Sequence, residues 1–219
     1  LDSDLKWDPT GNTLSINGTV KSGDGGTTNY TEIETDGTIE FLGDATVWND
    51  INVGAAMLSL PAAGNPDEDE YVDEGGSDTG VSTWAYAIGE KSSGSLEIPH
   101  DYKEGSDIYF HIHYQGITAP GGGTDNIKWQ LEYTVGQDGE TLDATTTITK
   151  EEAYTTQYSF TNHDFAAITG TNFNIGDQFL FTIERIAASA DDYAGDCLVS
   201  TVGLHYECDT AGSRQITTK

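Results

Sequence analysis

The segment "DIYFHIHYQ" at residues 107–115 contains two histidines one residue apart, a spacing that permits joint metal ligation or proton transfer. Successive side chains of a strand point to opposite faces, so His111 and His113 share one face, with Cβ atoms about 7 Å apart. The other face carries the residues expected in the core, which are Ile108, Phe110, Ile112 and Tyr114. The segment therefore predicts a strand whose histidines lie opposite the core.

A metal site needs more donors than this pair supplies, because zinc normally takes three or four protein ligands. The remaining histidines are His100, His163 and His205, and nothing in the sequence places them nearby. A threefold axis offers another route, since three His-x-His pairs would supply six nitrogens. We expect instead that the pair faces a neighbouring strand, a second sheet layer or a symmetry-related subunit, and we predict no metal ligands.

Two acidic segments are the other candidates for cation binding. Residues 67–78 contain seven acids, and residues 191–196 read "DDYAGD". Neither has the Asp-x-Asp-x-Asp-Gly spacing with a distal Glu that an EF-hand requires. We expect solvated charge at both.

Motifs for catalysis are missing from the sequence. It has no Gly-x-Ser-x-Gly elbow, no phosphate-binding glycine loop and no His-Glu-x-x-His. The glycine-rich stretch "APGGGTDN" at residues 119–126 reads as a turn between strands, and single carboxylate pairs are uninformative in so acidic a chain. We predict no catalytic residue and no cofactor, and we do not expect an enzyme.

The elements that must position these side chains are short strands. From Val81 onward, alternating runs recur between Gly, Asp and Pro turns, most clearly in "NIKWQLEYTVG" at residues 126–136. This spacing predicts an antiparallel β-sandwich, jelly-roll-like, over residues 51–219. Within it, residues 51–60 read as a buried strand or a short helix, and residues 62–80 as a long acidic loop.

Residues 1–50 predict a separate, small β segment. "LKWDPTGNTLSINGTV" has the pattern of a hairpin, and the stretch around Asp36 and Gly37 repeats it. Apolar residues are too sparse here to bury a core in one chain. The segment either packs on the next domain or shares a core with other copies of itself, as fibre segments do.

Charge and hydropathy exclude several partners. The net charge is −28, from 37 acids and 9 bases, which disfavours nucleic acid and anionic membranes. The sequence has no run of about 18 apolar residues, so we expect no membrane insertion. The chain begins at Leu1 without a basic and then apolar segment, so we expect no signal peptide and a piece of something longer.

The two cysteines, Cys197 and Cys208, end the alternating stretch "CLVSTVGLHYEC". A single strand of this length separates them by more than about 30 Å, whereas a disulfide needs Cα atoms within about 7 Å. We therefore predict two free thiols, which fits assembly in a reducing cytoplasm.

Four stretches together carry a resemblance to a known group of proteins. They are "TNYTEIETDGTIEFLGDATVWNDI" (28–51), "IPHDYKEGSDIYFHIHY" (98–114), "IKWQLEYTV" (127–135) and "GLHYECDTAGSRQ" (203–215). In combination they resemble tailed-phage virion proteins of the fibre, spike or decoration type. The resemblance implies a structural protein on the particle surface, assembled in the host cytoplasm, and brings no catalytic residues.

The resemblance also implies a homotrimer that contacts other virion proteins of the capsid or tail, and a host surface glycan or protein as a further partner. The alternative is a carbohydrate-binding β-sandwich module of a secreted protein, and a third reading is a glycan-degrading enzyme. Oligomeric state, glycan binding and sugar release separate the three.

Overall fold

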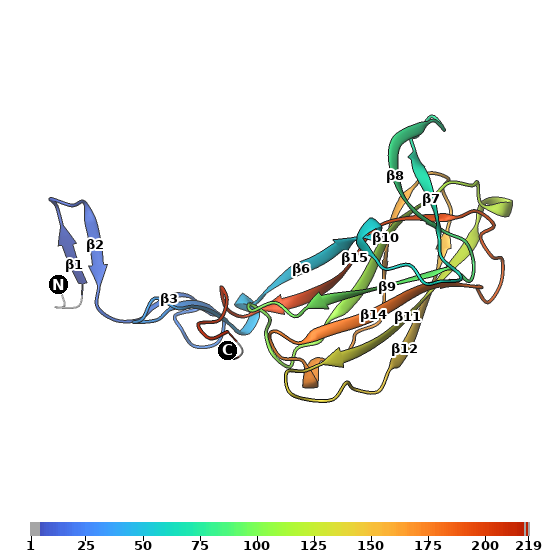
Figure 1. Cartoon of the computed structure of the whole chain (residues 1–219). Coiled ribbons are helices and arrows are strands. Elements are labelled where there is room, and N and C mark those ends of the chain that lie inside the picture. The colour runs from blue at the N-terminus through green and yellow to red at the C-terminus, as the bar shows by residue number, and fades with distance from the viewer. Residues whose placement is uncertain (1–4, 217, 219) are drawn as a thin grey trace.

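The computed structural model describes residues 5–216 and 218. Residues 1–4 of the predicted N-terminal segment and residues 217 and 219 of the predicted sandwich domain lie outside the described residues. The fold is all-β with antiparallel sheets, as predicted. Figure 1 shows a narrow stem (residues 5–46) that extends from a larger body (residues 47–208). The described helices are single 3-10 turns, η1 (Gly43–Ala45), η2 (Ala55–Met57), η3 (Gly121–Gly123) and η4 (Gly170–Asn172).

The body is a sandwich of two sheets. One has the order β13-β10-β15-β8-β7, with β6 also paired to β15, and the other has the order β12-β11-β14-β9. The strands of the first sheet are β6 (Val47–Gly54), β7 (Asp67–Val72), β8 (Asp78–Tyr86), β10 (Tyr109–Gly116), β13 (Phe160–Asp164) and β15 (Cys197–Cys208). Those of the second are β9 (Lys91–Glu97), β11 (Asp125–Gly136), β12 (Thr146–Tyr154) and β14 (Gln178–Ile186).

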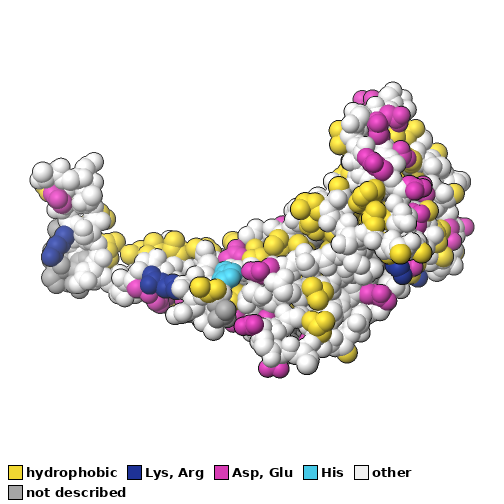
Figure 2. All heavy atoms as spheres, viewed as in Figure 1, with side chains coloured by type: hydrophobic (Ala, Val, Ile, Leu, Met, Phe, Trp, Pro, Cys, Tyr) yellow, Lys and Arg dark blue, Asp and Glu magenta, His cyan; other side chains and the backbone are white. Residues whose placement is uncertain are grey.

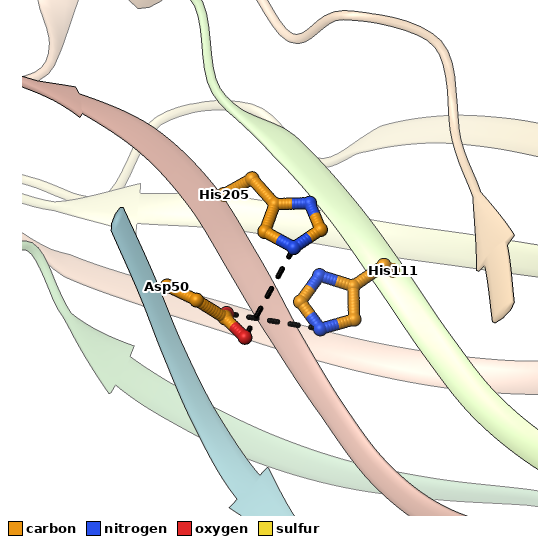
Figure 3. A group of neighbouring side chains, drawn as sticks. All are labelled: Asp50, His111 and His205. Atoms are coloured by element: carbon orange, nitrogen blue, oxygen red, sulfur yellow. Dashed lines mark ion pairs between the residues drawn. The ribbon is translucent and has the colours of Figure 1, made fainter. Parts of the chain in front are cut away.

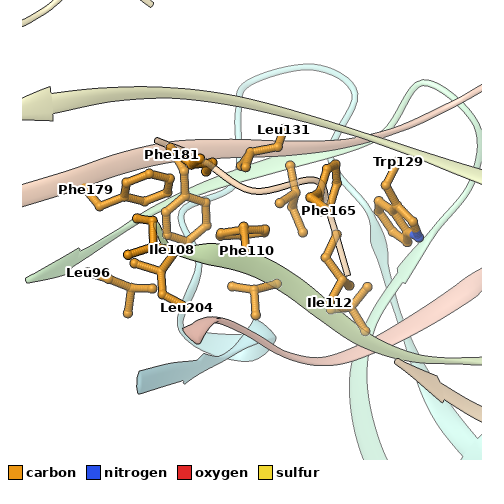
Figure 4. Packing of buried hydrophobic residues seen from close by; sticks show 14 of the residues in the cluster. Leu96, Ile108, Phe110, Ile112, Trp129, Leu131, Phe165, Phe179, Phe181 and Leu204 are labelled. Carbon is orange, nitrogen blue, oxygen red and sulfur yellow. The ribbon is translucent and has the colours of Figure 1, made fainter. Parts of the chain in front are cut away.

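The core lies between the two sheets and is rich in aromatic rings (Figure 4). The ring centroid of Phe110 on β10 lies 5.1 Å from that of Phe181 and 6.1 Å from that of Phe179, both on β14 of the opposite sheet. The residues predicted for the core face of β10 are all buried, and β11 buries Ile127, Trp129 and Leu131 on alternate positions. The alternation read from the sequence is confirmed because each of these strands covers one face of a shared core.

The stem contains two small sheets. One is the hairpin β1-β2 and the other has the order β3-β4-β5. Their strands are β1 (Leu5–Asp8), β2 (Thr13–Ile16), β3 (Val20–Gly23), β4 (Tyr30–Ile33) and β5 (Ile39–Leu42). The hairpins expected in this region are therefore present. In Figure 1 the hairpin β1-β2 is the part of the chain farthest from the body.

The boundary expected at residue 50 falls inside a strand at the junction between stem and body. Strand β6 runs across that position and pairs along its length with β15. The chain end returns to the stem, where the Phe41 amide donates to the Asp209 carbonyl at 2.7 Å and Arg214 pairs with Asp36 at 3.2 Å. The C-terminal residues therefore contact the stem through a backbone hydrogen bond and an ion pair.

The acidic segment is the main correction to the expected elements. Residues 62–80 were expected to form a long loop, whereas β7 and β8 form an antiparallel hairpin over much of this stretch. Gln115 fixes the hairpin to the body, since its amide accepts from the Val72 amide at 2.9 Å and donates to the Val72 carbonyl at 2.7 Å. Composition predicted the exposure of the acids, and strand pairing decided their conformation.

Residues 51–60 also differ from a uniformly buried strand. The chain leaves β6 at Gly54 and makes the turn η2. Leu58 is buried, but Met57 is 78% exposed and Leu60 is also exposed, so the prediction for these two was wrong. The connection between β13 and β14 makes the single turn η4.

The cysteines lie at the two ends of β15, and both are buried free thiols, as predicted. Burial raises the pKa of the Cys197 thiol to about 12, so it stays protonated. Among the described residues, no helix is long and apolar enough to cross a membrane.

Candidate functional site

The outer face of the larger sheet brings together side chains from three adjacent strands. His205 on β15 lies directly opposite Asp50 on β6, and His111 on β10 pairs with Gly203 on β15. Directly paired residues of antiparallel strands share a face, as do residues two apart along a strand. His111, His205 and Asp50 therefore converge on the side of the sheet away from the core (Figure 3).

The three side chains form a compact group. Asp50 Oδ1 lies 3.7 Å from His111 Nε2, and Asp50 Oδ2 lies 4.0 Å from His205 Nε2, as the dashed lines in Figure 3 show. The imidazole rings of His111 and His205 stack with centroids 4.2 Å apart and planes at 19°. One donor atom from each of the three residues lies within 4.8 Å of the others.

His111 is fully buried even though it lies on the outer face. Its ring lies against Gly203, where an added Cβ would come within 2.9 Å of His111 Cε1 and 2.5 Å of the Ile51 carbonyl oxygen. The absent side chain of Gly203 thus leaves the space for the imidazole. His205 covers it from above, so the ring lies between its own sheet and a second imidazole.

Both ring nitrogens of His111 lack a hydrogen-bond partner within the described part of the chain. Burial lowers the pKa of His111 to about 4; the imidazoles of His205 and His113 act in the same direction, while the carboxylates of Asp50 and Asp164 oppose them. At neutral pH the ring is uncharged and one nitrogen carries a free lone pair. A buried polar group in this state is uncommon and calls for a physical explanation.

Polar neighbours surround the group and fix its outer members. Asn52 Nδ2 donates to Asp50 Oδ2 at 3.2 Å. On the far side, Asp164 Oδ1 lies 3.9 Å from His205 Nδ1. Each exposed member of the group therefore has a polar residue positioned to orient it.

The other histidines lie in different surroundings. His113 contacts His111 edge to face at 4.9 Å and stacks near Phe160, but it is not among the three converging donors. His163 pairs with Ile112 on the core side of the sheet, where its Nδ1 lies 3.6 Å from Glu152 Oε2. His100 bonds to Ser213 at 2.6 Å through Nδ1.

Sequence reasoning predicted the outward direction of the His111 and His113 side chains but missed the residues that join His111. The alternation of β15, with Val202, Leu204 and Tyr206 inward, already implies that His205 points outward. Asp50 gave no comparable signal, because its place beside β15 depends on its pairing with His205, 155 positions later in the chain. That register is set by the tertiary fold.

An aromatic pair, with Trp48 exposed and Tyr109 half-buried, lies beside the group. Trp48 and Tyr109 meet edge to face with centroids 5.6 Å apart, and the Trp48 side chain is 57% exposed. They line a shallow hollow together with Asp164, Phe165 and His205. The outer face of the sheet thus carries a group of side chains of the types that ligate metals and, beside it, an apolar platform.

Comparisons with known proteins identify no family for the chain. No protein-family model matches it, and no curated protein matches its sequence.

Solved structures show weak likeness only. The CBM22-1-GH10 modules of Clostridium thermocellum xylanase 10B, complexed with xylohexaose, match at a TM-score of 0.37 and 11% identity, over 72% of this chain and 28% of theirs. TmCBM61, solved with β-1,4-galactotriose, matches at 0.31 and 12%, over 74% and 88% of the two chains.

A phage protein also appears among these structures. The stem and receptor-binding domain of spike protein P1 from bacteriophage PM2 matches at a TM-score of 0.29 and 10% identity, over 73% of this chain and 96% of that one. The solved structures that match thus include both carbohydrate-binding modules and viral structural proteins, and at these scores none carries an argument about function.

Proposed function

We propose that this chain is a non-enzymatic structural protein of a phage particle surface, a fibre, spike or decoration protein that assembles as a homotrimer through its stem. The observation that carries the proposal is an apolar face on the hairpin β1-β2. Leu5 pairs with Ile16 and Trp7 pairs with Leu14, so these four side chains lie on one face of the ribbon. The opposite face carries Lys6, Asp8, Thr13 and Ser15.

This face is uncovered in the single chain. Trp7 is 56% exposed and Leu14 is 57% exposed, and among the described residues the hairpin pairs with no strand outside itself. An isolated two-stranded hairpin is marginally stable in water, because burial of one face is needed to offset its ordering. Other copies of the same hairpin supply matching apolar faces without requiring a second kind of partner.

The apolar surface continues toward the body. In the sheet β3-β4-β5, Val20 pairs with Ile33 and Ile33 pairs with Ile39, which places an aliphatic row on one face. Ile33 and Ile39 are both exposed. Figure 2 shows hydrophobic side chains gathered along one edge of the stem. A continuous stripe of this kind suits parallel stems that share a narrow core.

The test is the oligomeric state of the wild type and of two double variants, measured by size exclusion with light scattering. We expect a trimer for the wild type and for Lys6→Gln/Thr13→Ser, which alters the polar face. We expect a monomer for Trp7→Ser/Leu14→Ser, which alters the apolar face. A monomeric wild type, or an apolar-face variant that assembles like the wild type, would refute the proposal.

A carbohydrate-binding module is the second candidate, and the aromatic pair of exposed Trp48 and half-buried Tyr109 is the observation that favours it. Aromatic faces beside carboxylates suit the stacking of a sugar ring with hydrogen bonds to its hydroxyls. Glycan-array binding by a monomeric wild type that is lost in Trp48→Ala would support this candidate over the fibre protein. Binding unchanged by Trp48→Ala would exclude the pair as the platform.

A further inference from the structure

We propose that Asp50, His111 and His205 form a binding site for one divalent transition-metal ion of the zinc type on the outer face of the larger sheet. The donors are two imidazole nitrogens and one carboxylate, a set that suits zinc and leaves a fourth position for water. The inference goes beyond the proposed function and does not depend on it, since the site lies in the body of one chain.

The donor atoms lie close to the separations that a tetrahedral site needs. Metal–ligand distances of about 2.1 Å in a tetrahedral site place two donors about 3.4 Å apart. Asp50 Oδ1 lies 3.7 Å from His111 Nε2, and Asp50 Oδ2 lies 4.0 Å from His205 Nε2. One donor atom from each of the three residues lies within 4.8 Å of the other two. The donors therefore lie within about 1.4 Å of the separation that a tetrahedral site needs, so binding requires side-chain rotation.

The state of the His111 side chain also favours a metal site. It is fully buried, both ring nitrogens lack hydrogen-bond partners among the described residues, and Nε2 points toward Asp50 as Figure 3 shows. An unsatisfied buried nitrogen costs free energy, whereas a metal bond would satisfy it. A neutral imidazole is also the form that binds metal, because the bond uses the nitrogen lone pair.

The other two ligands are less buried than His111, and polar neighbours contact them. His205 is partly exposed and stacks on His111, so binding requires it to tilt until its Nε2 faces the same point as that of His111. Asn52 already holds the Asp50 carboxylate by a hydrogen bond. Asp164 lies 3.9 Å from the other ring nitrogen of His205, the place where metal-bound histidines commonly have a carboxylate.

The net charge of −28 complicates any metal titration, because scattered carboxylates bind cations weakly. The experiment is therefore calorimetric titration of the full chain with Zn²⁺ in a large excess of Ca²⁺. Calcium prefers oxygen ligands and occupies the scattered acids, while imidazole nitrogens stay available. Titration with Co²⁺ adds absorption bands that report coordination by nitrogen and oxygen.

Asp50→Asn and His205→Gln test the site at its two less buried members, which limits damage to folding. His100→Gln is the matched control, since it removes an imidazole elsewhere, and thermal melting without metal checks that all variants fold. We expect one Zn²⁺ per wild-type chain, unchanged affinity in His100→Gln, and affinity reduced at least about tenfold in both site variants. Absence of stoichiometric binding under calcium, or wild-type affinity in both site variants, would overturn the proposal.

Discussion

The most informative single residue is Gly203, because it makes the burial of His111 possible. A Cβ at this position would lie 2.5 Å from the Ile51 carbonyl oxygen and 2.8 Å from Asn52 Cβ, both on the neighbouring strand β6. The absence of a side chain at Gly203 therefore allows two contacts: the close approach of β6 and the packing of the His111 imidazole against the sheet. Both are features of packing between strands rather than of turn conformation.

Gly203→Ala should destabilise the protein by about 1–3 kcal/mol, because the added methyl group overpacks a rigid region of the sheet. Gly54→Ala is the matched control. Gly54 lies at the end of β6 with φ −63° and no atom within 4 Å of an added Cβ, so its change should stay within about 0.5 kcal/mol. Urea unfolding measures both. Equal stability of the two variants would show that the contact at Gly203 does not constrain the sheet.

For single residues, the sequence predicted which face of the sheet a side chain lies on but not which side chains lie beside it. The alternation in β10 correctly separated Phe110 and Ile112 from His111. It did not predict that His111 would be buried, because the cover comes from His205 on a strand about 90 residues later. Period-2 patterns report which face a side chain takes, whereas burial on the outer face depends on what the next strands carry.

Among the elements, the turn between β3 and β4 shows how a stem with little core holds its shape. The Asp24 carboxylate accepts from the amides of Thr27 at 3.0 Å, Thr28 at 3.0 Å and Asn29 at 2.8 Å. These backbone hydrogen bonds lower the pKa of Asp24 to about 2, and the bond from the Asn29 amide contributes most to the lowering. The turn is therefore organised around an ionised side chain.

The pH dependence of this turn follows from the sign of the shift. A carboxyl with a lowered pKa in the fold stabilises it above the ordinary value of 3.8, and that contribution is lost as pH falls toward 2. NMR titration of the Asp24 carboxyl carbon should give a midpoint near 2, and the amide shifts of Thr27 to Asn29 should change in the same range. In Asp24→Asn those amide shifts should not titrate. A midpoint at the ordinary value would contradict the hydrogen-bonded turn.

Element types were largely predictable, and their boundaries less so. The hairpins of residues 1–50, the strands from Val81 onward and the free cysteines were read correctly, because each has a local pattern or a length constraint. The hairpin β7-β8 was missed, since an acidic sequence resembles a solvated loop unless its pairing partner is known. Pairing and anchoring by Gln115 overrode composition there.

For the whole molecule, the proposed assembly must overcome charge repulsion. Each chain carries −28, and acidic side chains are spread over the body and the hairpin β7-β8 in Figure 2. Apolar contacts between stems do not weaken with salt, whereas repulsion between chains is screened by it. Association should therefore strengthen as ionic strength rises from about 10 mM to about 150 mM. Association that weakens over this range would indicate contacts made by ion pairs instead.

Sedimentation equilibrium of the wild-type chain at physiological salt tests the central claim most directly. It measures mass independently of shape, which matters for a chain with an extended stem. The proposed stem assembly predicts a single species of three times the chain mass at micromolar concentration. A species of one chain mass at that concentration would contradict it.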